Sequence, residues 1–136
     1  VEKMSKSLDN HIELAATPEE TQKRVMQMVT DPQRMRRTDP GRPEVCNVFS
    51  MHKIFSPAEE VAMIDIECRR AGIGCVDCKK RFAANLNTHL APFRERRNEL
   101  AKDMEAVQAV LDDGAARARE IAEQTMREVR AAVGLP

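Results

Sequence analysis

The most constraining feature of this sequence is a run from Met104 to Val133 whose apolar side chains recur every three or four positions. On one face of an α-helix this spacing would place Val107, Leu111, Ala115, Ala118, Ala122, Met126 and Val129. Asp112-Asp113-Gly114 lies within the run, where it could interrupt the helix or allow another helix to approach closely at Gly114. The pattern predicts one long C-terminal helix.

The composition favours helices elsewhere too. The 136 residues include no Trp or Tyr and only four Phe, so a core must come from Ala, Val, Leu, Ile and Met, which suits helix packing better than a sheet. We therefore predict an all-α fold, antiparallel in part. The 22 basic and 22 acidic residues cancel, which argues against binding a polyanion through bulk charge. No apolar run reaches membrane-spanning length and no signal peptide is evident, so we expect a cytoplasmic protein with no membrane partner.

Two helix starts stand out in the first half of the chain. Thr17-Pro18-Glu19-Glu20 predicts a capping box with Pro18 as the first helical residue, and this helix should end at Thr30-Asp31-Pro32. Ser56-Pro57-Ala58-Glu59 repeats the capping pattern. The side chains expected to be buried in these two helices are Val25, Met28, Val29, Val61, Ile64 and Cys68.

The remaining segments are less regular. Ile12 and Leu14 alternate with polar residues, enough for a short strand or an extended linker at best, and residues 33–50 show no clear period. Gly72-Ile73-Gly74 should end one helix before another begins near Cys75. On one side of that helix we place Val76, Ala83, Leu86 and Leu90, with Pro92 kinking it or starting a segment to about Leu100.

Near the start of the sequence, residues 3–7 read KMSKS. Two compact ammonium groups with hydroxyls between them can surround a triphosphate and follow pyrophosphate as it departs. A random Lys/Ser pentapeptide would more simply be a solvated basic linker. This one matches a catalytic signature in full, and chance would produce it in a chain of this size only on the order of once in ten thousand.

The four cysteines follow the pattern C-x21-C-x6-C-x2-C: Cys46, Cys68, Cys75 and Cys78. Without a secretory signal, reduced thiols or metal ligation are favoured over disulfides. Amides at a helix start favour the thiolate form of Cys75 and Cys78, and ligation by Cys46 would hold the irregular connector in place. Free buried thiols, a tetrahedral zinc site and a [4Fe–4S] cluster remain as alternatives.

Longer stretches carry a family resemblance. The segments "KMSKSLDNHIEL", "TPEETQKRVMQMVTDP", "CRRAGIGCVDCKK" and "GAARAREIAEQTMREVRAAVGL" together resemble bacterial tryptophanyl-tRNA synthetases, class I aminoacyl-tRNA synthetases, from the KMSKS loop to the C-terminus. The similarity implies a C-terminal fragment without the upstream nucleotide-binding parallel sheet and its His-Ile-Gly-His signature. It implies a catalytic-loop segment over residues 1–16 and a helical anticodon-binding domain over residues 17–136.

The resemblance also assigns roles. Lys6 would stabilise the pyrophosphate leaving group with help from Lys3, and Met4, Ser5 and Ser7 would shape the loop around ATP and its Mg²⁺. Some members of the family carry a [4Fe–4S] cluster on a similar cysteine pattern, which favours this group over zinc for Cys46, Cys68, Cys75 and Cys78. Its role would be structural, since tryptophan activation involves no redox step.

The family further implies tRNA(Trp), the missing nucleotide-binding half and, in the full-length enzyme, a second identical subunit as partners. Among three basic groups, Lys79, Lys80 and Arg81 lie next to the last cysteine, and we predict that they contact RNA. For each group an ordinary solvated surface is the competing interpretation. We therefore expect part of a tryptophan-tRNA ligase that is inactive alone. The alternative is a standalone metal-binding helical module without catalytic role.

Overall fold

The computed structural model describes residues 4–135, and within them the chain is all-helical, as predicted. Two short 3₁₀ turns and five α-helices follow one another with no β-strand in this part of the chain. In order, the elements are η1 (Lys6–Leu8), α1 (Pro18–Gln27), η2 (Pro43–Val45), α2 (Asn47–Phe55), α3 (Ala58–Arg69), α4 (Cys75–Leu100) and α5 (Met104–Val133).

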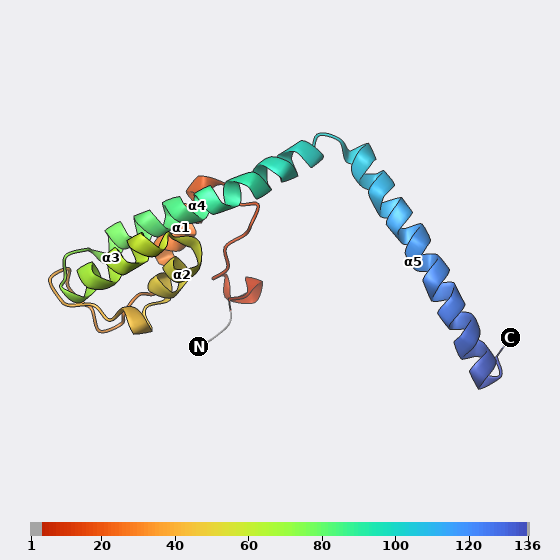
Figure 1. Cartoon of the computed structure of the whole chain (residues 1–136), viewed down its shortest axis with the longest axis horizontal. Helices are drawn as coiled ribbons and strands as arrows, with labels where there is room; N and C mark the ends of the chain where they lie inside the picture. The colour runs from red at the N-terminus through yellow and green to blue at the C-terminus, as the bar shows by residue number, and fades with distance from the viewer. Residues whose placement is uncertain (1–3, 136) are drawn as a thin grey trace. The chain divides into compact units, whose positions relative to one another are not determined.

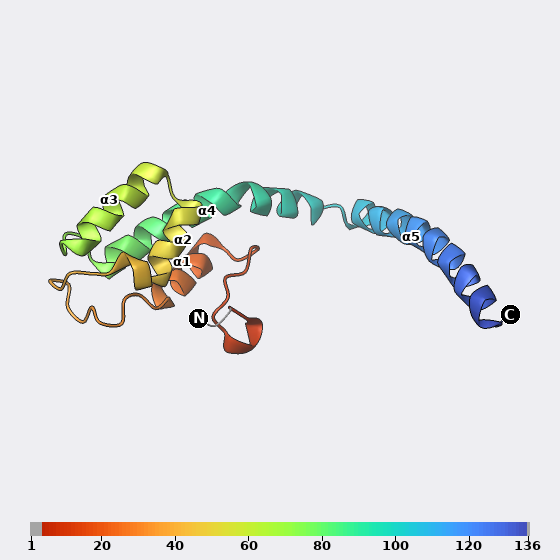
Figure 2. The same ribbon diagram turned by 60° about the horizontal axis from the view of Figure 1, so that its bottom comes forward.

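The chain forms two compact units, Val1–Arg94 and Glu95–Pro136. In the first unit, α1, α2 and α3 gather around the N-terminal part of α4 in both views (Figures 1 and 2). Within it α2 packs against α3 and η2. These units divide the chain elsewhere than after residue 16, and the predicted separation of a loop segment from a helical domain stays a prediction.

A small apolar core holds the first unit together. Phe82 and Ile64 are its largest fully buried apolar side chains, one from α4 and one from α3. The other buried members of the cluster are Val25, Cys46, Val48, Phe49, Ile73, Cys78, Ala83, Leu86 and Leu90. Every one comes from residues 25–90, so this core belongs to the first unit alone.

The capping box predicted for α1 is confirmed. Thr17 accepts a hydrogen bond from Glu20 N, and the Glu20 carboxylate accepts one from Thr17 N at 2.8 Å. The helix ends at Gln27, three residues earlier than predicted, and Val25 is fully buried whereas Val29 is 64% exposed. The prediction for Val29 was wrong because its position follows the last helical turn.

Polar contacts attach α1 to α4. Arg94 donates to Thr21 Oγ1 at 2.7 Å and to the Leu14 carbonyl at 3.3 Å, and Thr21 is fully buried. Asn87 donates to the Pro18 carbonyl at 3.1 Å. These bonds supply partners for groups that apolar packing alone would leave unsatisfied.

The sequence interpretation missed α2. It placed residues 33–50 in an irregular connector, but α2 begins at Asn47, and it assigned Ser56 a capping role that the structure gives to no side chain. Ser56 ends α2 instead, and its hydroxyl bonds to His52 Nδ1 at 2.7 Å and accepts from Asn85 at 2.9 Å. The helix was missed because a histidine stands among the buried residues of a nine-residue helix.

Two further predictions concern α4 and α5. The helix α4 continues through Pro92, and it buries Ala83, Leu86 and Leu90 as expected, while Val76 is 52% exposed. The predicted bounds of α5 are confirmed, and Gly114 does not interrupt it. Within the described residues α5 buries no side chain, so its apolar face is exposed. None of the helices described is long and apolar enough to cross a membrane.

Candidate functional site

Residues 4–7 of the KMSKS segment lie in a short exposed turn around η1. Ser5 caps η1, because its Oγ accepts a hydrogen bond from Leu8 N at 3.3 Å, and this Oγ lies 3.0 Å from Ser7 Oγ. Lys6 is exposed, as are Met4 and Ser7. Lys3 lies outside the described residues. The turn thus presents the ammonium of Lys6 to solvent, and ATP binding by these residues stays a prediction.

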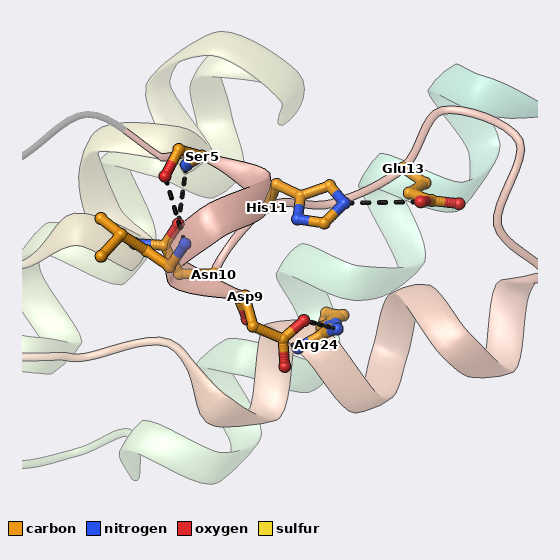
Figure 3. Close-up of polar contacts among 7 residues, drawn as sticks. Ser5, Asp9, Asn10, His11, Glu13 and Arg24 are labelled. Carbon is orange, nitrogen blue, oxygen red and sulfur yellow. Dashed lines mark hydrogen bonds and ion pairs between the residues drawn. The ribbon is translucent and has the colours of Figure 1, made fainter.

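Asp9 ends this turn in the left-handed region, with φ 48°. Asp and Asn adopt that conformation more readily than most residues. Arg24 of α1 donates to the Asp9 carbonyl at 2.8 Å and to its carboxylate at 2.5 Å (Figure 3). The guanidinium lowers the pKa of the Asp9 carboxyl below its ordinary value, so this ion pair is charged at neutral pH.

A pocket of about 520 Å³ lies beside this contact. One side is formed by the segment after η1 and the other by α1. Its lining residues are Asp9, His11, Glu13, Ala16, Glu20, Lys23, Arg24 and Gln27. His11 Nε2 lies 3.4 Å from a Glu13 carboxylate oxygen, and His11 Nδ1 is buried with no partner among the residues described (Figure 3). Charged groups of both signs therefore line the pocket next to the turn.

The four cysteines all belong to the first unit and all are free thiols. Cys46 directly precedes α2, and Cys68 lies near the end of α3. Cys75 is the first residue of α4, and Cys78 lies one turn further on. Cys46 and Cys78 are buried, whereas Cys68 and Cys75 are partly exposed.

Arg34, from the connector, reaches two of these thiols. Its Nη1 lies 3.7 Å from Cys68 Sγ and 3.8 Å from Cys75 Sγ, and its Nη2 donates to the Ile73 carbonyl at 2.8 Å. Its Nε is buried and has no partner among the described residues. Gly41 approaches from the same connector, because a Cβ built there would stand 2.4 Å from Cys68 Sγ. The Arg34 guanidinium thus borders Cys68 and Cys75, and the Gly41 backbone borders Cys68.

Cys78 is one of the two buried thiols. The Cys78 carbonyl accepts a hydrogen bond from His52 Nε2 at 3.2 Å. His52 Nδ1 therefore carries no proton and accepts a hydrogen bond from the Ser56 hydroxyl. Burial, with a smaller contribution from the neighbouring Cys46, Cys68 and Cys75, raises the pKa of the Cys78 thiol to about 12. Burial also disfavours the charged form of His52, and for an imidazole this lowers the pKa. His52 is therefore a neutral packing residue whose ring meets Phe82 edge-on at 5.2 Å.

The geometry does not support the predicted metal site as it stands. Within residues 4–135 no three His, Cys, Asp or Glu side chains are placed so that they could hold a metal ion. Neither zinc nor an iron–sulfur cluster therefore gains direct support from the arrangement.

The basic group after the last cysteine is partly engaged in packing. Lys79 donates to the Met26 carbonyl near the end of α1 at 2.8 Å, and Arg81 lies 3.5 Å from the Glu60 carboxylate. Lys80 is exposed, and no hydrogen bond or ion pair of its side chain is found among residues 4–135. Of the three predicted RNA contacts, Lys80 is the one whose charge is free for a partner.

Sequence reasoning gave no role to Asp9 or Arg24, and it considered Arg34 only as part of a basic group that could contact RNA or be ordinary surface. Asp9 and Arg24 are 15 residues apart, and Arg34 reaches thiols 34 and 41 residues away. The only local signal was the Asp-Asn pair after KMSKS, which favours a left-handed turn end. Contacts between residues so far apart in the sequence produce no periodic pattern that sequence analysis could detect.

Comparison with known proteins decides the family. The family described as "tRNA synthetases class I (W and Y)" matches residues 1–91, which include the KMSKS turn and the four cysteines. The chain belongs to this family. Within it, a tryptophan–tRNA ligase of Aquifex aeolicus is 48% identical over 98% of the chain, and one of Thermotoga maritima is 43% identical over the same share.

A solved member of this synthetase family has the same fold. It is the tryptophanyl-tRNA synthetase of Campylobacter jejuni complexed with ADP and tryptophan, with a TM-score of 0.83 and 30% identity over 98% of the chain. The chain spans 41% of that structure, and 34% and 41% of the Aquifex and Thermotoga relatives. The similarity thus covers the whole of this chain but less than half of each relative.

Proposed function

We propose that this chain supplies the ATP-binding loop and the helical tRNA-recognition region of a tryptophan-tRNA ligase. The observation that carries the proposal is the intact KMSKS turn with an exposed Lys6, in a chain whose relatives are tryptophan–tRNA ligases. The Campylobacter structure, with ADP and tryptophan, supports an adenine nucleotide as ligand. We propose ATP with Mg²⁺ as the form used by the full-length enzyme. No specific observation favours the alternative of a standalone metal-binding module.

In this proposal Lys6 stabilises charge on the departing pyrophosphate, because a lysine is a compact donor on a turn that can follow the leaving group. Lys3 assists, and Met4, Ser5 and Ser7 shape the turn around the nucleotide. The nucleotide-binding half supplies the adenine and tryptophan pockets, and the full-length enzyme acts as a homodimer. The chain alone should be inactive, since proximity of the substrates provides much of the rate.

The test is tryptophan-dependent ATP–pyrophosphate exchange by the chain joined to the nucleotide-binding half of a close relative. We expect exchange by the joined protein and none by the chain alone. Lys6→Ala should lower the rate on the order of a hundredfold. Lys102→Ala, an exposed lysine between α4 and α5, is the matched control and should have no effect. Equal rates for the two variants would refute the role of Lys6.

For tRNA(Trp) we propose that the exposed side of the N-terminal part of α4 contacts the anticodon stem–loop, with Lys80 foremost and Arg81 and Lys79 beside it. Lys80→Ala should weaken binding of this RNA and reduce the slope of log affinity against log salt by about 0.7 to 0.9, since one phosphate contact is lost. Lys79→Ala should also affect stability, because it removes the bond to Met26. An unchanged salt slope for Lys80→Ala argues against the contact.

We also propose that Cys46, Cys68, Cys75 and Cys78 hold a [4Fe–4S] cluster. Three features support it: four thiols in one unit, a buried Arg34 Nε without a partner, and a glycine cradle against Cys68 Sγ. Cys46, Cys68, Cys75 and Cys78 would hold the cluster through four thiolates, the ligands that iron–sulfur clusters take in proteins. When bound, the cluster would tie the connector to α3 and α4 without taking part in tryptophan activation.

Metal analysis of anaerobically purified protein tests the cluster. Brown protein with iron and sulfide near four per chain is the expected result, with loss of colour in Cys46→Ser and Cys75→Ser. Colourless protein with one zinc per chain would refute the cluster and favour the zinc site. Protein without either metal would favour free thiols.

A further inference from the structure

The turn that carries Lys6 is held to the helical unit at one point. Arg24, in the last turn of α1, donates from Nη1 to the Asp9 carbonyl at 2.8 Å and from Nη2 to the Asp9 carboxylate at 2.5 Å. Figure 3 shows the guanidinium reaching up from α1 to Asp9 beneath the turn. Because two nitrogens of Arg24 donate to Asp9, they fix the orientation of Asp9 as well as its position.

Other polar contacts of the turn are internal. Ser5 N donates to Asn10 Oδ1 at 2.9 Å, Ser5 Oγ accepts from Leu8 N, and Asp9 N donates to the Lys6 carbonyl at 3.1 Å. They keep the shape of the turn but attach it to nothing else. Among the hydrogen bonds and ion pairs of the described residues, only those of Arg24 join residues 4–10 to a helix.

Apolar packing adds little to this attachment. No residue from Met4 to Asn10 is buried, and Met4 and Leu8 are 46% and 53% exposed. Asp9 is the residue that closes η1, with its N–H on the Lys6 carbonyl and its backbone in the left-handed region. Because Asp9 closes the turn on the Lys6 carbonyl, a guanidinium that holds Asp9 in place also holds the backbone of Lys6–Leu8.

We propose that Arg24 is a positioning residue for tryptophan activation by ATP: by binding Asp9, it sets where the Lys6 ammonium stands relative to α1. The inference rests on the proposed function of the KMSKS turn and goes beyond it by naming a residue of the helical unit that acts through the loop. The contacts of Arg24 with the turn are to Asp9, so its effect passes through that residue.

The contact can be tested without disturbing the fold. The Asp9 side chain is 77% exposed, and exposed ion pairs contribute little to global stability, so variants at either residue should fold. Asp9→Asn keeps a residue suited to the left-handed conformation and the carbonyl acceptor, but removes the charge. Arg24→Lys keeps the charge and loses the two-pronged geometry. Arg69→Ala is the matched control, because Arg69 likewise forms ion pairs at the surface, with Glu44 and Asp65.

The first measurement is backbone ¹⁵N relaxation of the chain. Arg24→Ala should lower the order parameters of residues 6–10 to below about 0.6, with the thermal midpoint unchanged. Arg24→Lys and Asp9→Asn should give intermediate values, and Arg69→Ala should leave the turn as it is. Unchanged order parameters in Arg24→Ala would overturn the inference.

The second measurement is ATP–pyrophosphate exchange by the chain joined to its nucleotide-binding half. Arg24→Ala should lower kcat about tenfold with the KM for tryptophan unchanged, and Arg24→Lys should restore part of the loss. Normal kcat in Arg24→Ala, beside an active parent and an inactive Lys6→Ala, overturns this inference alone. An inactive parent overturns the proposed function and this inference with it.

Discussion

Asp31 shows how a single carboxylate can organise a segment without regular structure. Its side chain is 4% exposed, and its two oxygens accept hydrogen bonds from Gln33 N, Arg42 N, Arg42 Nε and Arg42 Nη2. The bonds from Arg42 close the connector onto itself across eleven residues. Hydrogen bonds from a charged partner and from backbone amides lower the pKa of Asp31 well below its ordinary value of 3.8.

This carboxylate should make folding stability depend on acid. The unfolded chain binds a proton at Asp31 at higher pH than the folded chain does, so its stabilising effect is complete above about pH 4 and is lost as the pH falls below that. Urea unfolding between pH 2 and 6 should show this decline, and Asp31→Asn should reduce it. Glu123→Gln, an exposed position on α5, should leave the decline intact. Identical pH profiles for Asp31→Asn and the parent would contradict the prediction.

Gly41 is a second residue whose identity the tertiary structure requires. A Cβ there would stand 2.4 Å from Cys68 Sγ and 3.3 Å from Arg34 Cδ. Gly41→Ala should therefore destabilise the first unit by about 1–3 kcal/mol, the usual effect of overpacking. Denaturant unfolding measures the change. A variant as stable as the parent would show that the Cys68 side chain can turn away without cost.

Helices of this chain differ in what stabilises them. The helix α1 has a complete capping box and buries Thr21 and Val25, whereas α5 has an Asp103 cap and buries nothing among the described residues. A helix without buried contacts depends on its length, its caps and its residue propensities. The first-turn Glu105 and the last-turn Arg130 also complement the helix dipole of α5.

Gly114 offers a direct test of that difference. It lies inside α5, and a Cβ there would meet nothing within 4 Å, so its only effect is the poor helix propensity of glycine. Gly114→Ala should stabilise α5 by about 1 kcal/mol and raise the helical signal in circular dichroism. It is also the control for Gly41→Ala, since replacing glycine by alanine should increase stability at residue 114 and decrease it at residue 41. A loss of helicity would indicate that a partner approaches closely at this position.

On the scale of the whole molecule, burial is confined to one part of the chain. The apolar core comes from residues 25–90, while α5 belongs to the second unit. The chain thus separates a packed unit, which carries the KMSKS turn and the four cysteines, from a long helix with an exposed apolar face.

Removing α5 should leave the packed unit folded. A chain that ends after Lys102 retains all of α4 and every buried apolar residue. Its thermal midpoint should lie within about 2 °C of that of the parent, because no buried contact is lost. Calorimetry of the two chains measures this. Loss of cooperative unfolding in the shorter chain would show that the first unit depends on α5.

Much of the local structure followed from local chemistry. The bounds of α5, the capping box of α1 and the helix break at residues 72–74 were all predicted, because periodicity, caps and glycines act within about four residues. The KMSKS motif and the longer segments around it likewise indicated the family, because a contiguous stretch of residues can be recognised without the fold. A capping pattern misled only at Ser56, whose hydroxyl instead donates to His52 Nδ1 one helical turn earlier and accepts from Asn85, 29 residues away.

The sequence by itself therefore determined four of the five α-helices described, the capping box of α1 and the family to which the chain belongs. Only the tertiary structure decided that Arg24 holds the turn of Lys6, that Arg34 stands between two thiols, and that Gly41 faces Cys68. The physical reason is that these contacts join residues 15 to 41 positions apart. Such pairs meet because of the path of the folded chain, and neither member carries a local pattern that identifies the other.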